Sequence, residues 1–193
     1  MPYLKKSLFQ AHELAGLAVK EGDTVVDATM GNGHDTEFLA SLVGEKGRVF
    51  AFDIQPTALE RTRDRLEKAH CLDWCTLILD GHENMDAYIH EPVKLVIFNL
   101  GYLPKGDHAI GTRYETTRRA IEKSLALISD DGLILIVIYY GGDSGFEEKD
   151  ALLSFLNTLD CRRYTVMRTE FMNQINCPPI LIAIEKNISI SSR

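Results

Sequence analysis

The sequence lacks the long hydrophobic run that a membrane-spanning helix needs. Its longest apolar stretch, residues 133–140, is only as long as a buried strand. Residues 1–6 contain two lysines and none of the apolar segment that opens a secretory signal. We therefore expect the protein to stay in the cytoplasm.

Cysteine is scarce, and its spacing does not suggest a metal site or a redox motif. The chain has four cysteines and no C-x-x-C pair. In a reducing compartment such cysteines are free thiols. A zinc site based on Cys71 and Cys75 is disfavoured, and no metal is predicted.

An excess of positive charge is also missing. The chain has 21 Lys and Arg against 28 Asp and Glu, a formal net charge of −7. This balance argues against binding long nucleic acid through bulk electrostatics. It leaves room for a local basic patch that meets one small folded RNA.

The chain also lacks repeats, low-complexity segments and linker-like changes in composition, so residues 1–193 are predicted to form one domain. Apolar runs typical of buried strands alternate with amphipathic segments typical of helices. Helices are expected at 6–20, 35–43, 56–70, 112–128 and 146–159, with a short one near 84–88. Strands are expected at 24–27, 47–53, 74–79, 93–98, 133–140, 162–169 and 180–185, with a turn at 130–132. The last two strands are predicted to pair as an antiparallel hairpin. This order predicts an α/β, Rossmann-like fold: a seven-stranded, mostly parallel sheet with an antiparallel last strand and helices on both faces.

The most informative motif follows the first expected strand, where residues 27–33 read Asp-Ala-Thr-Met-Gly-Asn-Gly before a helix starts. Glycine lets the backbone approach a ligand closely. The residues predicted to bind a cofactor here are Asp27, Met30, Gly31, Asn32 and Gly33. A dinucleotide fingerprint would carry a third glycine where Thr36 stands. We therefore favour S-adenosyl-L-methionine (SAM), with an NAD(P)-binding oxidoreductase or a merely structural turn as alternatives.

The ends of the next two expected strands add further candidates for the cofactor. Asp53 stands where an acid would accept hydrogen bonds from ribose hydroxyls, and Gln55 follows on the same edge. Gly81 and His82 stand where an adenine amino group would be held. The alternatives are a helix cap for Asp53 and a solvated loop histidine for His82.

The segment Asn-Leu-Gly-Tyr-Leu-Pro, residues 99–104, follows the fourth expected strand and concerns the substrate. An amine nucleophile needs acceptors to orient it, and the Asn99 carbonyl can supply one. The Tyr102 ring can stack on a flipped-out base. Asn99 and Tyr102 are therefore predicted to be catalytic and Gly101 to bind substrate, the alternative being a turn with a core tyrosine.

Two more segments are predicted to border the same cleft. Arg113 belongs to an arginine-rich stretch that could hold RNA phosphates, although a solvated helix face is the alternative. Tyr140 begins a glycine-rich segment and is assigned to substrate binding. Arg61, Arg65 and Lys68 share a helix face and are expected to be solvated.

The chain resembles a known bacterial family, and the resemblance covers nearly its whole length. It rests on residues 27–36, 53–55, 99–107, 116–117 and 173–179, of which 99–104 and 173–179 are the specific segments. The family consists of class I SAM-dependent methyltransferases, formerly described as "putative rRNA methylase". Its members convert 5-aminomethyl-(2-thio)uridine at the tRNA wobble position to the 5-methylaminomethyl form. The resemblance implies SAM as cofactor, a homodimer and the tRNA anticodon stem-loop as partner. Gly142 stands where the family usually has a histidine.

The expected chemistry is the alignment of an amine with an electrophilic methyl group. A free aminomethyl group has a lysine-like pKa of about 10.4, so the site must favour its neutral form. No residue is assigned as general base. Methylation of rRNA or of a small-molecule amine, and a catalytically silent binding protein, are the remaining alternatives.

Overall fold

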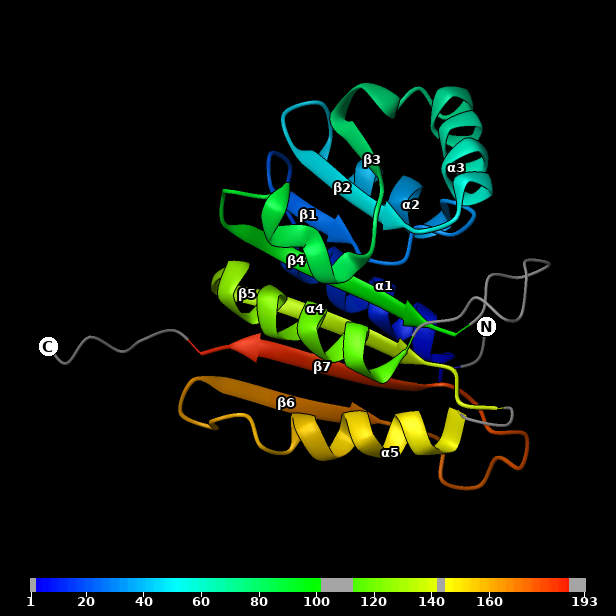
Figure 1. Ribbon diagram of the computed structural model, residues 1–193, viewed down its shortest axis with the longest axis vertical. Coiled ribbons are helices and arrows are strands. Elements are labelled where there is room, and N and C mark those ends of the chain that lie inside the picture. The colour runs from blue at the N-terminus through cyan, green and yellow to red at the C-terminus, as the bar shows by residue number, and fades with distance from the viewer. Residues whose placement is uncertain (1–2, 102–112, 142–144, 188–193) are drawn as a thin grey trace, which may run out of the picture.

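The computed structural model describes residues 3–101, 113–141 and 145–187, and its centre is one seven-stranded sheet (Figure 1). In sheet order the strands are β3 (Cys75–Leu79), β2 (Arg48–Asp53), β1 (Thr24–Asp27), β4 (Val93–Leu100), β5 (Ile128–Ile138), β7 (Ile180–Lys186) and β6 (Tyr164–Thr169). The first five run parallel, and β7 lies antiparallel between β5 and β6. The predicted α/β fold is thereby confirmed, including the hairpin of the last two strands.

Helices cover both faces of the sheet, and each face has its own buried apolar cluster. One face carries α1 (Ser7–Ala18), α2 (His34–Val43) and α3 (Pro56–Lys68). The other carries α4 (Tyr114–Leu127), α5 (Gly145–Leu156) and the 3₁₀-helix η2 (His82–Ala87). A second 3₁₀-helix, η1 (Leu72–Trp74), precedes β3. We call the two sides the α1–α3 face and the α4–α5 face.

Strand β4 shows how one apolar run builds both clusters. Ile97 packs into the cluster of the α1–α3 face, and Phe98 packs into that of the α4–α5 face. Both side chains are fully buried, and burial of each stabilises the fold by about 1.5–3 kcal/mol. Because side chains alternate along a strand, Asn99 falls on the α1–α3 face and Leu100 on the α4–α5 face.

Strand β5 differs from its predicted bounds. It begins at Ile128 rather than at residue 133, and it ends at Ile138. The predicted turn at 130–132 is instead an irregularity within the strand, where the register with β4 shifts between Val93 and Leu95. Asp131 there has φ of +67°, and its carboxylate lies 2.8 Å from Lys94 Nζ. Tertiary pairing with β4 therefore converts a turn-like sequence into a bulged strand.

Among the described residues, no helix has the length and apolar character needed to cross a membrane. All four cysteines are free thiols. Burial raises the pKa of Cys75 to about 12, and its Sγ donates to the Cys71 carbonyl oxygen at 3.1 Å. In the part of the chain that the structure describes, no three His, Cys, Asp or Glu side chains gather as a metal site would require.

Candidate active site at the carboxyl ends of the parallel strands

The segment between β1 and α2, residues 30–33, forms a tight turn that we call the glycine turn. Gly31 and Gly33 have φ of +54° and +76°, in the left-handed region that favours glycine. A Cβ on Gly33 would lie 2.8 Å from the Thr62 side chain of α3. Only glycine can therefore hold this turn against α3. The half-buried Gly31 and Asn32 remain partly accessible at the end of β1.

Asp27 lies beneath the glycine turn and is completely buried. Its carboxylate accepts hydrogen bonds from Thr36 Oγ1 at 2.7 Å and from the Thr29 backbone N–H at 3.1 Å. Burial, together with the nearby Asp35 carboxylate, raises the pKa of Asp27 to about 7. Thr36, at the position of the third glycine in a dinucleotide fingerprint, therefore supplies the hydroxyl that this buried carboxylate needs.

Asp53, at the end of β2, connects that strand to the glycine turn. Its carboxylate accepts from the Gly31 backbone N–H and from the Gln55 backbone N–H, each at 2.9 Å. A carboxylate has about four lone-pair sites, so the half-buried Asp53 can accept further hydrogen bonds. Gln55 is half-buried beside it.

Arg65 of α3 does not lie on the solvated face that its spacing predicts. Arg65 donates from Nε to the Asn32 carbonyl oxygen at 2.8 Å and forms an ion pair with Glu37 at 2.8 Å. Arg61 donates to Asn32 Oδ1 at 3.2 Å. The expectation was wrong for Arg65, because α3 packs beside α2 and this arginine reaches the backbone carbonyl of Asn32 in the glycine turn. Arg61 is exposed, as expected. Lys68 is exposed, as expected.

His82 is buried, so the alternative of a solvated loop histidine is wrong. Its Nδ1 lies 2.9 Å from the Ala28 carbonyl oxygen, and its ring meets Phe98 edge-on with centroids 5.6 Å apart. Burial lowers the pKa of His82, which favours the neutral ring. The neutral ring carries its proton on Nδ1, facing the carbonyl, and leaves Nε2 as an acceptor. Gly81, which precedes it, is half-buried.

Asn99 is the centre of a second polar group, on the α1–α3 face. Its backbone N–H donates to Thr29 Oγ1 at 2.7 Å, and its Nδ2 donates to the Asp35 carboxylate. The other oxygen of Asp35 lies 2.6 Å from His12 Nε2, and the His12 ring stacks on Phe38 with centroids 4.1 Å apart. Asn99 Oδ1 is buried and has no hydrogen-bond partner among the described residues.

Sequence reasoning missed His12 and Asp35. Asp35 belongs to the motif at 27–36 but was not assigned a role. His12 lies in a predicted helix beside Ala11 and Ala15, which are both completely buried. A polar ring next to that buried face was the available signal.

The two tyrosines after β5 point to opposite faces of the sheet. The Tyr139 backbone N–H donates to the Leu100 carbonyl oxygen at 2.9 Å, and a Cβ on Gly101 would lie 3.2 Å from Tyr139 Cβ. Burial, followed by the Asp35 charge, raises the pKa of Tyr139. Tyr140 instead packs against the α4–α5 face, with its ring 4.7 Å from Lys149 Nζ. Tyr139, which sequence reasoning did not select, is thus the one near Asn99; Tyr102 and Gly142 lie outside the described residues.

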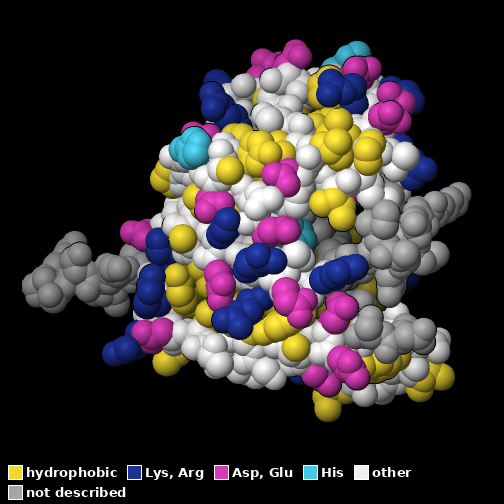
Figure 2. Space-filling model, viewed as in Figure 1, with side chains coloured by type: hydrophobic (Ala, Val, Ile, Leu, Met, Phe, Trp, Pro, Cys, Tyr) yellow, Lys and Arg dark blue, Asp and Glu magenta, His cyan; other side chains and the backbone are white. Residues whose placement is uncertain are grey.

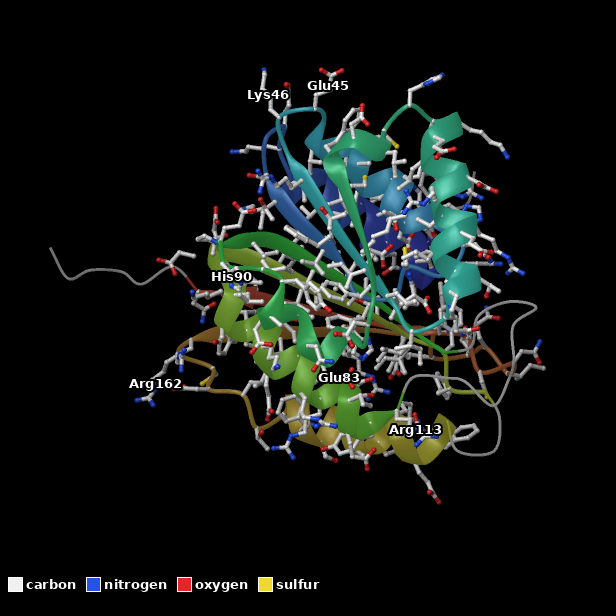
Figure 3. All side chains as sticks on the ribbon, turned by 45° about the horizontal axis from the view of Figure 1, so that its top comes forward. Glu45, Lys46, Glu83, His90, Arg113 and Arg162 are labelled. Carbon is white, nitrogen blue, oxygen red and sulfur yellow. The ribbon has the colours of Figure 1, made fainter. Side chains whose placement is uncertain are left out.

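Arg113 precedes α4 and has an exposed side chain without an acidic partner among the described residues. Figure 3 shows it at the opposite end of the molecule from Glu45 and Lys46, which lie between α2 and β2. Further along α4, Arg118 pairs with Glu122 at 3.1 Å. Figure 2 shows the surface over α4 as a mixture of basic and acidic side chains rather than a uniform basic patch.

Known proteins share the sequence and the fold of this chain. A family model described as "Putative rRNA methylase" matches residues 49–185. A solved structure from Clostridium thermocellum, described as a "putative rRNA-methylase", is 58% identical, with a TM-score of 0.95 over 96% of this chain and 100% of that one. A methyltransferase from Streptococcus mutans, solved in complex with S-adenosylhomocysteine (SAH), is 41% identical, with a TM-score of 0.87 over 95% of this chain and 99% of that one. The chloroplastic tRNA (mnm⁵s²U34)-methyltransferase of Arabidopsis thaliana is 32% identical over 94% of this chain and 70% of its own length.

The residues at the ends of β1 and β2 suit an adenosyl cofactor. Asp53 has lone pairs left for ribose hydroxyls, neutral His82 offers an acceptor, and Gly31 puts no side chain over the end of β1. The chain belongs to the family described as "Putative rRNA methylase", and it is a SAM-dependent methyltransferase.

Proposed function

We propose that this protein methylates the 5-aminomethyl group of a wobble (2-thio)uridine in tRNA and forms the 5-methylaminomethyl group. The observation that carries the proposal is the buried Oδ1 of Asn99, which has no hydrogen-bond partner in the described part of the chain. Buried polar atoms in native structures are almost always paired, so an open acceptor at the carboxyl end of a strand indicates a missing donor. An amine is such a donor, and the name of the Arabidopsis relative supports a wobble uridine as its carrier.

The cofactor side of the cleft consists of the glycine turn with Asp53, Gln55, Gly81 and His82. When bound, SAM supplies an electrophilic methyl group on a sulfonium. Asp53 would accept hydrogen bonds from the ribose hydroxyls, and His82 would offer Nε2 to the adenine amino group. Met30, Gly31, Asn32 and Gly33 would lie against the cofactor through their backbone. Asp27 would support them from below.

The substrate side of the cleft consists of Asn99, Gly101, Tyr139 and the residues that hold them. A lysine-like amine has a pKa of about 10.4 in water, and burial at this site favours its neutral form. Asn99 Oδ1 would accept one N–H and so direct the nitrogen lone pair toward the methyl group. Tyr102 would stack on the base.

The RNA would approach over the start of α4. Arg113 is exposed and without an acidic partner among the described residues, so its guanidinium is available to a phosphate. The chain is acidic overall, with a net charge of −7, and the surface of α4 is of mixed charge (Figure 2). Recognition would therefore rest on a few local contacts with a folded anticodon stem-loop rather than on a general basic surface.

A methyl-transfer assay tests the proposal. The purified protein is incubated with labelled SAM and with tRNA from cells that accumulate the 5-aminomethyl form, and rRNA from the same cells is the matched substrate. We expect label in tRNA, with the 5-methylaminomethyl nucleoside identified by mass spectrometry. Unlabelled tRNA would contradict the proposal. Label in rRNA alone would favour the alternative that the family description names.

We also propose that the protein forms a homodimer through α1 and the edge strand β6. A groove of about 510 Å³ lies between them, lined by Leu14, Leu17, Met167 and Leu181 among others. Leu17 is 82% exposed and Met167 is 47% exposed, so the groove presents apolar side chains that a second copy of the chain would cover. Sedimentation equilibrium should give a dimer for the wild type and a monomer for Leu17→Asp. A monomeric wild type would contradict the proposal.

A further inference from the structure

We infer that Asp35 is a positioning residue that sets which end of the Asn99 amide faces the substrate, and that His12 holds Asp35 for this task. The inference rests on the proposed function, in which Asn99 Oδ1 accepts an N–H from the reacting amine. It adds two residues, from α1 and α2, to a site otherwise built from β4 and β5.

The first step concerns the two ends of the Asn99 side chain. The carbonyl and amino ends of an asparagine have nearly the same shape, so the hydrogen-bond partners decide the orientation. An ionised carboxylate only accepts hydrogen bonds. Asp35 therefore binds the amino end of Asn99 and leaves Oδ1 directed away from it, where the structure shows no partner among the described residues. If the amide turned over, two acceptors would face each other and the open acceptor would be lost.

The second step concerns what holds Asp35. It is only 8% exposed, and its other oxygen lies 2.6 Å from His12 Nε2. His12 is fixed in turn by stacking on Phe38 and by its place on α1, which packs against β5 and β7. The neighbouring Asp27 is buried and bonded to Thr29 and Thr36, so it cannot take the place of Asp35.

The third step separates positioning from direct catalysis. Asn99 and His12 each bond one oxygen of Asp35, and it is the burial of Asp35, at 8% exposed, that leaves little of the carboxylate for a substrate. Asp35 should therefore act through Asn99 and have no effect of its own on the reaction. The effects of substituting Asp35 and Asn99 should therefore not add, and a double-mutant cycle measures this coupling directly.

The cycle consists of Asp35→Asn, Asn99→Ala and the double variant, each assayed for kcat on tRNA and for SAH affinity by calorimetry. The amide introduced by Asp35→Asn can present either end to Asn99, so we expect a loss of roughly 10-fold in kcat and unchanged SAH affinity. Asn99→Ala should cost roughly 100-fold, and the double variant about the same as Asn99→Ala alone. A further 10-fold loss in the double variant, or a wild-type kcat for Asp35→Asn, would overturn the inference.

Two substitutions of His12 test its part. His12→Gln keeps an N–H donor near the position of Nε2 and should retain most of the activity, whereas His12→Leu should lose several-fold in kcat. Equal losses would show that His12 only fills space.

Glu45→Gln is the matched control for Asp35→Asn. It also replaces an acid near α2 by its amide, but Glu45 lies in the exposed turn at the far end of the molecule (Figure 3).

A spectroscopic test needs no substrate and so separates this inference from the proposed function. In ¹⁵N-labelled protein, the side-chain amide pair of Asn99 is identified by its loss in Asn99→Ala. A hydrogen bond to a carboxylate should shift one of its protons downfield, and Asp35→Leu should reverse the shift while SAH still binds. An unchanged pair would overturn the inference even if tRNA is methylated. Failure of tRNA methylation with the shift present would overturn only the proposed function.

Discussion

The two sides of the cleft differ in how their polar groups are paired. On the cofactor side, Asp27 and Asp53 each accept two hydrogen bonds from the chain itself, and Arg65 binds the Asn32 carbonyl of the glycine turn. On the substrate side, Asn99 has its backbone N–H and its side-chain amino group bonded, but its side-chain oxygen has no partner within residues 3–101, 113–141 and 145–187. On the first side each carboxylate already has partners within the chain. On the second side one buried acceptor has no partner among the described residues.

This difference shows which substitutions should affect folding and which should affect chemistry. Hydrogen bonds within the chain stabilise the folded state, so their loss lowers the free energy of unfolding. An acceptor that forms its hydrogen bond only with a bound ligand does not stabilise the folded state. Its removal should therefore affect only turnover. Each prediction below tests one side of the cleft against a matched residue elsewhere.

The largest effect is expected at Gly33. Gly33→Val places a branched side chain at φ of +76°, with its Cβ 2.8 Å from Thr62, and should lower the free energy of unfolding by roughly 5 kcal/mol. The control is Gly16→Ala in α1, where nothing lies within 4 Å and the backbone is helical; it should raise stability by about 0.5–1 kcal/mol. Urea denaturation of the cofactor-free protein measures both. Similar changes in the free energy of unfolding for Gly33→Val and Gly16→Ala would show that the glycine turn does not require glycine at position 33.

Asp27 should make the stability of the protein depend on pH. Its pKa is 3.8 in an ordinary setting and about 7 in the folded protein. Between these values the folded state keeps a proton that the unfolded chain has lost, so Asp27 makes the free energy of unfolding fall as the pH rises. Asp27→Asn removes this contribution while its amide can still bond Thr29 and Thr36. The stability gained by the variant should grow from pH 4 to pH 7, to at most roughly 4 kcal/mol, and stay constant above.

Denaturation at several pH values with and without Asp27→Asn gives that difference directly. Other carboxyl groups, such as Asp80 with its lowered pKa, contribute equally to both proteins and cancel. If the difference in the free energy of unfolding between Asp27→Asn and the wild type did not depend on pH, Asp27 would be ionised at every pH tested. The cofactor side would then hold a buried charge.

Most of the fold was predictable from sequence because periodicity reports local structure well. The predicted bounds of β1 agree with the structure, because Thr24 to Asp27 stands between a Gly-Asp turn and the motif. The start of β5 was not, because Ile128 is drawn into the sheet by pairing with Val93, a contact between residues far apart in the chain. Contacts between residues far apart in the chain cannot be predicted from the local periodicity of the sequence.

The residues of the cleft could also be predicted only where local sequence is sufficient. Sequence spacing selected the ends of β1, β2 and β4, since open sheets bind ligands there. It missed His12 and Asp35, because their contact with Asn99 depends on how α1 packs over β4 and α2 over β1. It also preferred Tyr140 to Tyr139, whereas strand alternation from Asn99 and Val137 places Tyr139 on the same face as Asn99. The roles of all these residues remain predictions.

On the substrate side, Asn99→Ala removes the hydrogen bond to Asp35 and should lower the free energy of unfolding by about 1 kcal/mol. It should lower kcat roughly 100-fold, which corresponds to about 3 kcal/mol in the activation barrier. SAH affinity should remain within a factor of two or so of the wild type, because the cofactor side keeps all its hydrogen bonds. Asn157→Ala, at an exposed position after α5, is the control and should change neither quantity. Calorimetry and single-turnover kinetics separate binding from turnover. A large loss of SAH affinity in Asn99→Ala would show that the two sides are not independent.

The smallest expected effect concerns two arginines that each form an ion pair, one in the cleft and one on the surface. Arg65 binds the Asn32 carbonyl and Glu37, whereas Arg162 forms an exposed pair with Asp160 at 3.0 Å. Arg65→Ala leaves the Asn32 carbonyl without a partner and should lower the free energy of unfolding by about 1 kcal/mol. Arg162→Ala removes only a solvated pair and should change it by less than about 0.5 kcal/mol. Because Arg65 holds the glycine turn, its loss should also weaken SAH binding several-fold, which Arg162→Ala should not do. Equal effects of the two variants on SAH affinity would show that the turn keeps its shape without α3, and that the backbone and Asp53 alone suffice to hold it.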